Sequence, residues 1–182
     1  MILFDLPVYQ FIMSMFTTSS SVVTLMSFFT SFGSTLVIVS GILCVAILYK
    51  NKKYFFNFLS ACLIGTILNN LIKIIVRRPR PTNTMPFTYE SSYSFPSGHT
   101  MMSTIFYGLI IYYVYKNMKN KKLKTFIICI LSLIIFMVGL SRVYLGVHYA
   151  TDVLGGYIFG IIYLVVFIRL MNKFENRKLK NK

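Results

Sequence analysis

The sequence predicts an all-α fold: a polytopic membrane bundle of five transmembrane helices, or six if residues 5–30 hold a further span. Of the 182 residues, 56% are hydrophobic and only 13% are charged, about half the charged fraction of a typical soluble domain. Uncharged apolar runs of about 17–23 residues recur along the chain, and that length crosses a bilayer. The segments between the runs are too short for a soluble domain, so residues 1–182 are expected to form one membrane domain.

Five segments are expected to cross the membrane, and each ends at a basic or polar block. They cover 33–49, 54–76, 97–115, 125–145 and 148–168. In the last of them, Gly156 and Gly160 form a pair of small residues four positions apart, which is typical of closely packed helices.

The basic residues decide the orientation of these spans. The net charge is +15, and of the 19 Lys and Arg residues three lie at 50–53, five at 116–124 and six at 169–182. Alternation through five spans places all three basic segments on one side, which the positive-inside rule assigns to the cytoplasm. The basic residues are therefore expected to face anionic lipid headgroups, and nucleic acid is not an expected partner.

The N-terminal segment, 1–32, is expected to lie on the membrane surface. Residues 6–49 carry no charge, but the stretch at 14–21 is rich in Ser and Thr. This composition favours one or two short helices in the outer interface over residues 5–30. The alternative is an additional span with a cytoplasmic N-terminus. A cleavable signal is not expected, because no basic residue precedes the apolar stretch. The remaining divisions are a core at 33–170 and a basic cytoplasmic tail at 171–182.

A first polar cluster follows the second predicted span and contains Lys73 and Arg80. Pro79 is expected to end the helix near Arg78, so that Arg80 turns back from the loop. Arg77 and Arg78 fit the ordinary behaviour of cations that extend from a helix end toward water. Lys73 is followed by three more apolar residues, and a charge at such a depth usually faces a cavity that serves function.

A second cluster, Pro96-Ser97-Gly98-His99, opens the third predicted span. Ser97 suits the N-cap position of a helix. The N–H groups at a helix start bind phosphate, and a glycine such as Gly98 allows the backbone to approach an oxyanion closely. His99, in the first turn, would point into the same space.

A third cluster combines Arg142 with His148 and Asp152. His148 and Asp152 are four residues apart and share one helix face. A carboxylate bound to one imidazole nitrogen fixes the tautomer and leaves the other nitrogen as a nucleophile. Metal binding by His99, His148 and Asp152 is disfavoured, because the clustered cations would repel a divalent ion. No cofactor is expected.

These three clusters together resemble the signature of the type 2 phosphatidic acid phosphatase family, in order, internal spacing and placement. The matching residues are Lys73-x6-Arg80-Pro81, Pro96-Ser97-Gly98-His99 and Ser141-Arg142-x5-His148-x3-Asp152. The resemblance covers roughly residues 33–170 and implies the helical core that this family shares with haloperoxidases. It is strongest to small bacterial membrane members that dephosphorylate undecaprenyl pyrophosphate or phosphatidylglycerophosphate.

The resemblance implies a metal-independent lipid phosphatase in a bacterial plasma membrane, with its active site on the extracytoplasmic face and its C-terminus in the cytoplasm. In that reading His148 attacks phosphorus to form a phosphohistidine, Asp152 orients it, and His99 protonates the leaving oxygen. The phosphoryl oxygens would be held by Lys73, Arg80, Ser97, Gly98 and Arg142.

Other functions for the same residues are a phosphotransferase that passes the phosphoryl group to another lipid, and a vanadate-dependent haloperoxidase, which the membrane spans disfavour. An anion transporter is a different class, but a nucleophile–acid pair has no purpose in a pore. A non-catalytic scaffold would have no use for Lys73, His148 and Asp152 within its helices. The partners expected are a lipid phosphate and the bilayer; the sequence does not determine the oligomeric state.

Overall fold

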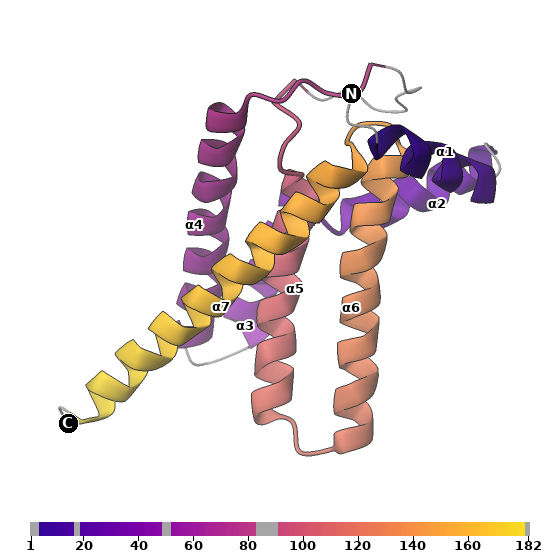
Figure 1. The fold of residues 1–182 in the computed structure, drawn as a ribbon. Helices are drawn as coiled ribbons and strands as arrows, with labels where there is room; N and C mark the ends of the chain where they lie inside the picture. Colours follow the sequence, from indigo (N-terminus) through magenta and orange to yellow (C-terminus); the bar gives the residue numbers. More distant parts are fainter. Residues whose placement is uncertain (1–3, 17–18, 49–51, 83–90, 181–182) are drawn as a thin grey trace.

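The computed structural model consists of seven helices within the part of the chain that it describes, residues 4–16, 19–48, 52–82 and 91–180, with side chains to residue 177 (Figure 1). The helices are α1 (Asp5–Met15), α2 (Ser20–Ser31), α3 (Thr35–Leu48), α4 (Lys52–Val76), α5 (Gly98–Asn117), α6 (Lys121–Tyr144) and α7 (Ala150–Lys180). No strand occurs in the described segments. The predicted all-α fold is confirmed.

Helix α5 forms the centre of the bundle, packed against α4, α6 and α7. Its contact with α7 is close, because a Cβ atom at Gly156 would lie 2.9 Å from Thr100 Cβ and one at Gly160 would lie 2.9 Å from Thr104 Cβ. The prediction of close helix packing at this glycine pair is confirmed. Two buried hydroxyl groups of α5 are satisfied within the helix: those of Ser103 and Thr104 donate to the carbonyl of Thr100 at 3.0 and 2.8 Å.

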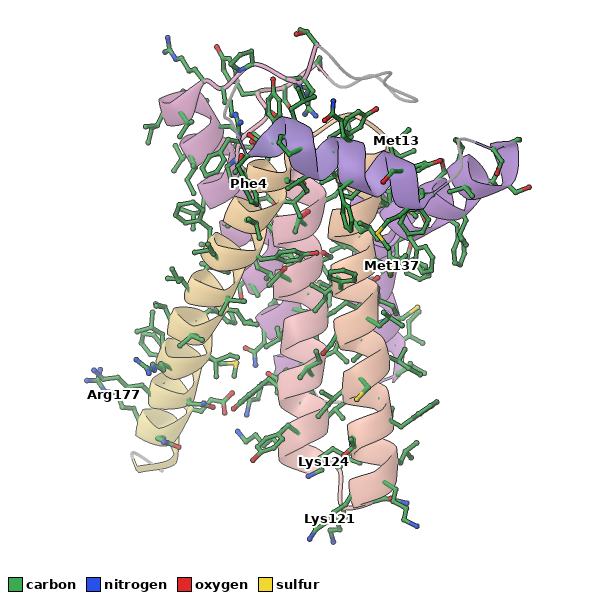
Figure 2. All side chains as sticks on the ribbon, turned by 45° about the vertical axis from the view of Figure 1, so that its right-hand side comes forward. Phe4, Met13, Lys121, Lys124, Met137 and Arg177 are labelled. Atoms are coloured by element: carbon green, nitrogen blue, oxygen red, sulfur yellow. The ribbon has the colours of Figure 1, made fainter. Side chains whose placement is uncertain are left out.

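The two N-terminal helices lie across one end of the bundle (Figures 1 and 2). Ser19 caps α2 by accepting from the Val22 amide at 3.3 Å. Both helices pack against the end of α6 and the turn that follows it, where Ile12 and Met26 join a buried cluster around Tyr144. The short helices expected over 5–30 are present as α1 and α2, and their position at the membrane surface stays a prediction.

Three described helices, α4, α6 and α7, are long and apolar enough to span a membrane, and the bent pair α2–α3, with an angle of 46° between its halves, would make a fourth. The predicted segment 97–115 corresponds to α5, which lies among the other helices. This position allows it to carry polar residues that would be unfavourable in a span exposed to lipid. The segment 33–49 corresponds to α3, whose 14 residues reach only about 21 Å. The count of five spans stays a prediction.

The two ends of the bundle differ in charge. The turn between α5 and α6 and the far end of α7 lie at one end, where Lys121, Lys124 and Arg177 project (Figure 2). The residues that follow α4, those that precede α5 and the turn between α6 and α7 lie at the opposite end, beside α1 (Figure 1). Helix α7 continues to Lys180, through most of the predicted tail. The three predicted polar clusters therefore gather at the end opposite to the one where Lys121, Lys124 and Arg177 project.

Candidate active site

Arg80 folds back from the end of α4 onto the turn before α7. The helix ends at Val76, and Arg77 adopts a left-handed conformation with a φ of 51° that redirects the chain. The Arg80 Nη1 donates to the carbonyl of Val147 at 2.8 Å and lies 3.3 Å from Nε2 of His148. The backbone turn at Arg77 and the proline that follows thus bring this guanidinium beside the imidazole.

Lys73 is buried in the last turn of α4, with 7% of its surface exposed. Its Nζ donates to the carbonyl of Tyr93, in the segment that descends to α5. This ammonium group does not extend outward along the helix. It faces inward, as expected for a charge placed before three apolar residues.

The start of α5 places Ser97, Gly98 and His99 on the opposite wall. Ser97 occupies the N-cap position, as predicted, but its side chain makes no capping hydrogen bond; its Oγ accepts instead from the Thr100 hydroxyl at 3.0 Å. Among the residues that the structure describes, a Cβ atom at Gly98 would meet only Asn69 Oδ1 within 4 Å, at 3.4 Å. The space above the Gly98 backbone is therefore open to a ligand atom.

His148 and Asp152 form a buried pair at the start of α7. His148 Nδ1 lies 3.3 Å from Asp152 Oδ2, and this oxygen also accepts from the Tyr149 amide at 2.9 Å and from the Ser94 hydroxyl. An ionised carboxylate can only accept hydrogen bonds, so the proton of neutral His148 belongs on Nδ1. Its Nε2, the potential nucleophile, then faces Arg80.

Burial lowers the pKa of His148 from 6.5 to about 4, and the positive charges of Arg142 and Arg80 act in the same direction, against the carboxylate of Asp152. The imidazole is consequently neutral at physiological pH. Arg142 itself is buried near the end of α6, where its Nη1 donates to Thr30 Oγ1 in α2 at 3.0 Å.

A single cavity of about 190 Å³ joins most of these groups. Five of the eight predicted site residues line it, namely Lys73, Arg80, Gly98, His99 and His148. The other three, Ser97, Arg142 and Asp152, are buried close by. The cavity adjoins a larger open hollow of about 780 Å³ that shares Asn70, Lys73, Arg80 and Ser92 with it. Both histidines thus face one space that is large enough for a phosphate group.

Two residues near the pair were missed by reasoning from sequence. Arg78 was expected to extend toward water, but it is mostly buried and its Nη1 lies 2.6 Å from Asp152 Oδ1. Its Nη2 lies 2.7 Å from Oδ2 of Asp5, which is itself buried. The expectation for Arg78 is wrong, because α1 covers this end of the bundle and removes the water that the side chain would otherwise reach.

Asn69 and Ser94 were also missed. Asn69 lines the cavity one turn below Lys73, and its spacing of four residues was the available signal. Ser94 lay in a proline-rich loop with no periodicity, so nothing in the sequence indicated its bond to Asp152. Among the described residues, no three His, Cys, Asp or Glu side chains come together as metal ligands.

These features define a class of protein: a polytopic helical membrane protein with a buried histidine–aspartate pair and several cations around one cavity at the end of its bundle. The chain belongs to the PAP2 superfamily, whose family model matches residues 54–176. The matched region runs from the start of α4 into the far end of α7 and contains all three clusters.

Two curated relatives are informative. Phosphatidylglycerophosphatase B of Bacillus subtilis (strain 168) is 40% identical over 117 residues, covering 61% of this chain and 56% of that protein. Undecaprenyl-diphosphatase BcrC of the same organism is 31% identical over 111 residues, covering 58% of this chain and 51% of that protein. The chain spans about half the length of these relatives.

The fold is shared with solved structures. The crystal structure of the first transmembrane PAP2 type phosphatidylglycerolphosphate phosphatase from Bacillus subtilis matches with a TM-score of 0.83 and 29% identity, covering 93% of this chain and 85% of that one. The structure of Aquifex aeolicus LpxE matches with a TM-score of 0.64 and 22% identity, covering 92% and 96%, and supports the fold alone.

Proposed function

We propose that the protein is a membrane lipid phosphatase that releases inorganic phosphate from a lipid phosphate through a phosphohistidine on His148, without a metal ion. The observation that carries the proposal is the cavity lined by both histidines together with Lys73 and Arg80. A phosphoryl group placed there meets a nucleophile, an acid and fixed cations at once.

Catalysis of phosphoryl transfer depends mainly on positioning the phosphoryl group and neutralising the negative charge of its oxygens in the transition state. The lone pair of His148 Nε2 attacks phosphorus, and the bond from phosphorus to the leaving oxygen breaks as protonated His99 gives that oxygen its proton. The Nδ1 proton stays hydrogen-bonded to Asp152, whose negative charge stabilises the ring as it becomes positive.

In the second step a water molecule attacks the phosphohistidine. His99, now neutral, takes a proton from the water, and the P–N bond breaks so that its electrons return to Nε2. Phosphate leaves and both histidines regain their starting states. Throughout, the cations Lys73, Arg80 and Arg142, with Ser97 and the Gly98 amide, hold or neutralise the phosphoryl oxygens.

Phosphatidylglycerophosphate is the first substrate to test, because the relative named for that activity shares 40% identity and the solved phosphatase of that name has a TM-score of 0.83. The open hollow beside the cavity supports a lipid substrate, since Ile74 of α4, half exposed on the outer wall of the bundle, lines it. A lipid tail would leave past this residue while its phosphate enters the cavity. The site would face the extracytoplasmic side of a bacterial plasma membrane.

The test is phosphate release by the purified protein in detergent from phosphatidylglycerophosphate, undecaprenyl pyrophosphate and phosphatidic acid in parallel, each with and without a chelator. Release that persists with chelator and disappears in His148→Ala is expected. Transfer of labelled phosphate to an added lipid would indicate the phosphotransferase, and anion flux through proteoliposomes without hydrolysis would indicate the transporter. Either result in place of release would refute the proposal.

A further inference from the structure

The carboxylate of Asp5 lies at the edge of the active site, although it belongs to the first helix. It is 1% exposed. Its Oδ1 accepts from the amide and the hydroxyl of Thr151, both at 2.9 Å, and its Oδ2 lies 2.7 Å from Arg78 Nη2. Thr151 immediately precedes Asp152, so α1 is attached directly to the helix turn that carries the catalytic carboxylate.

Arg78 is held on three sides. Its Nη1 is bound by Asp152 at 2.6 Å and by the Thr151 hydroxyl at 2.7 Å, and its Nη2 by Asp5. The guanidinium also lies over the ring of Tyr149, 4.1 Å from the centroid. A mostly buried guanidinium held between two carboxylates keeps its charge and has less freedom to move than one in an exposed ion pair.

The charges of this cluster have a consequence for His148. Arg78 alone would neutralise Asp152 and weaken its attraction for a positively charged imidazole. The carboxylate of Asp5 offsets Arg78, so Asp5, Arg78 and Asp152 together keep one net negative charge next to the ring. That charge is what stabilises His148 when it becomes positive on attacking phosphorus.

We propose that Asp5 and Arg78 are positioning residues for the His148–Asp152 pair: Arg78 fixes the place of Asp152, and Asp5 restores the negative charge that Arg78 cancels. The N-terminal helix is then part of the active site. The inference deepens the proposed function and rests on it for the role of the His148–Asp152 pair. Its electrostatic part is tested by a measurement that requires no catalytic activity.

Other charged groups also act on His148, and they stay constant in the test. Arg80 contacts its Nε2, Arg142 acts from α6, and Lys73 and His99 share its cavity. Because these groups are the same in every variant below, a change in the protonation of His148 reports the altered cluster alone.

The experiment follows both histidines by NMR in protein labelled with ¹⁵N-histidine and held in detergent, with the signals assigned through His99→Gln. It compares the ratio of protonated to neutral His148 at the pH where the wild type is half protonated. Asp5→Asn removes a negative charge at constant shape and should lower this ratio at least about threefold, whereas Arg78→Gln should raise it by a similar factor. The double variant restores one net negative charge and should return the ratio close to that of the wild type.

Two controls separate charge from structure. Thr151→Val removes hydrogen bonds to Asp5 and Arg78 without changing charge, and should change the ratio by less than half as much as Asp5→Asn. Glu175→Gln breaks the ion pair with Lys53 (2.8 Å) at the opposite end of the bundle, and should leave the ratio unaltered. Thermal unfolding confirms that each variant is folded, and if Arg78→Gln is not, the near-isosteric Asp5→Asn decides alone.

The inference is overturned if folded Asp5→Asn leaves the ratio unchanged or raises it, if Asp5→Asn and Arg78→Gln move it in the same direction, or if Thr151→Val matches Asp5→Asn. Activity gives a second measurement: kcat of Asp5→Asn should fall about three- to tenfold at unchanged KM. A wild type that releases no phosphate from any lipid, with the NMR shifts as expected, would refute the proposed function and leave the electrostatic inference standing.

Discussion

His148 Nδ1 lies 3.3 Å from Oδ2 of Asp152, across one turn at the start of α7, and the same oxygen accepts from the Tyr149 amide. The carboxylate is thereby fixed by the backbone of the turn that also carries the imidazole. The pair is nearly inaccessible, with 3% of His148 and none of Asp152 exposed. A ring held in this way presents its Nε2 to the cavity in one tautomer.

Replacement of His148 by Ala should abolish phosphate release, by at least about 10³-fold, because the nucleophile is lost. Extraction from membranes and thermal unfolding in detergent should be close to those of the wild type, since the side chain lines a cavity. Substantial residual release by the folded variant would exclude His148 as nucleophile.

Asp152→Asn should reduce kcat about 10³-fold or more with little change in KM, because an amide that donates to Nδ1 favours the wrong tautomer of the ring. Steady-state kinetics on one lipid phosphate measure both constants. The matched carboxylate-to-amide change Glu175→Gln, remote from the site, should leave both as in the wild type. Equal effects of the two substitutions would contradict the role given to Asp152.

The pH dependence of kcat/KM should be bell-shaped, since His148 must be neutral to attack and His99 protonated to donate. The pKa of His148 is lowered to about 4, so the loss of activity that it causes appears only as the pH falls toward that value. His99→Gln should remove the alkaline limb along with most of the activity. A profile without an alkaline limb would count against His99, and one without a fall toward pH 4 would count against His148.

The same pKa shift predicts a loss of stability in acid. The folded protein binds the His148 proton only near pH 4, whereas an unfolded chain binds it near 6.5. The contribution is therefore fully present above pH 6.5 and falls, by at most about 1.4 kcal/mol per pH unit, as the pH drops toward 4. Unfolding midpoints measured from pH 7 to 4.5 should decline less steeply in His148→Gln; equal slopes would show that His148 is protonated in the folded state.

Gly156→Ala should destabilise the bundle by about 1–3 kcal/mol, because the added methyl would lie 2.9 Å from Thr100 Cβ and 3.0 Å from the carbonyl of Ser97. The matched change Gly65→Ala meets the flexible end of Ile105 and should cost less. Unfolding midpoints in detergent compare the two. Because Gly156 faces the start of α5, activity should fall only in Gly156→Ala.

The sequence was sufficient for the helices and for the approximate position of the clusters. Apolar runs of bilayer length are bounded by charge, so α4 and α6 begin and end within a few residues of the predicted segments. Consecutive spans cross the membrane in opposite directions, so every second connecting segment lies on the same side. His99, His148 and Lys73 could therefore be assigned to one end without knowledge of any contact.

Arg78 and Asp5 illustrate what local sequence could not determine. A cation at a helix end can be surrounded by water or paired with a carboxylate. The residues next to Arg78 in the sequence do not distinguish these two cases. Its partner Asp5 lies 73 residues away, in a segment with no periodic signal. Ser94 is similar, because its role depends on an Asp152 that is 58 residues distant.

Length and hydrophobicity therefore determined where the long helices form and at which end of the bundle the polar clusters lie, because both follow from the cost of leaving polar groups in hydrocarbon. Only the tertiary structure decided that Asp5 of α1 binds Thr151 beside Asp152, that the Ser97 side chain makes no capping hydrogen bond, and that Arg78 binds two carboxylates. Those outcomes depend on contacts between groups far apart in the sequence that shield one another from water. Local sequence patterns cannot predict such contacts.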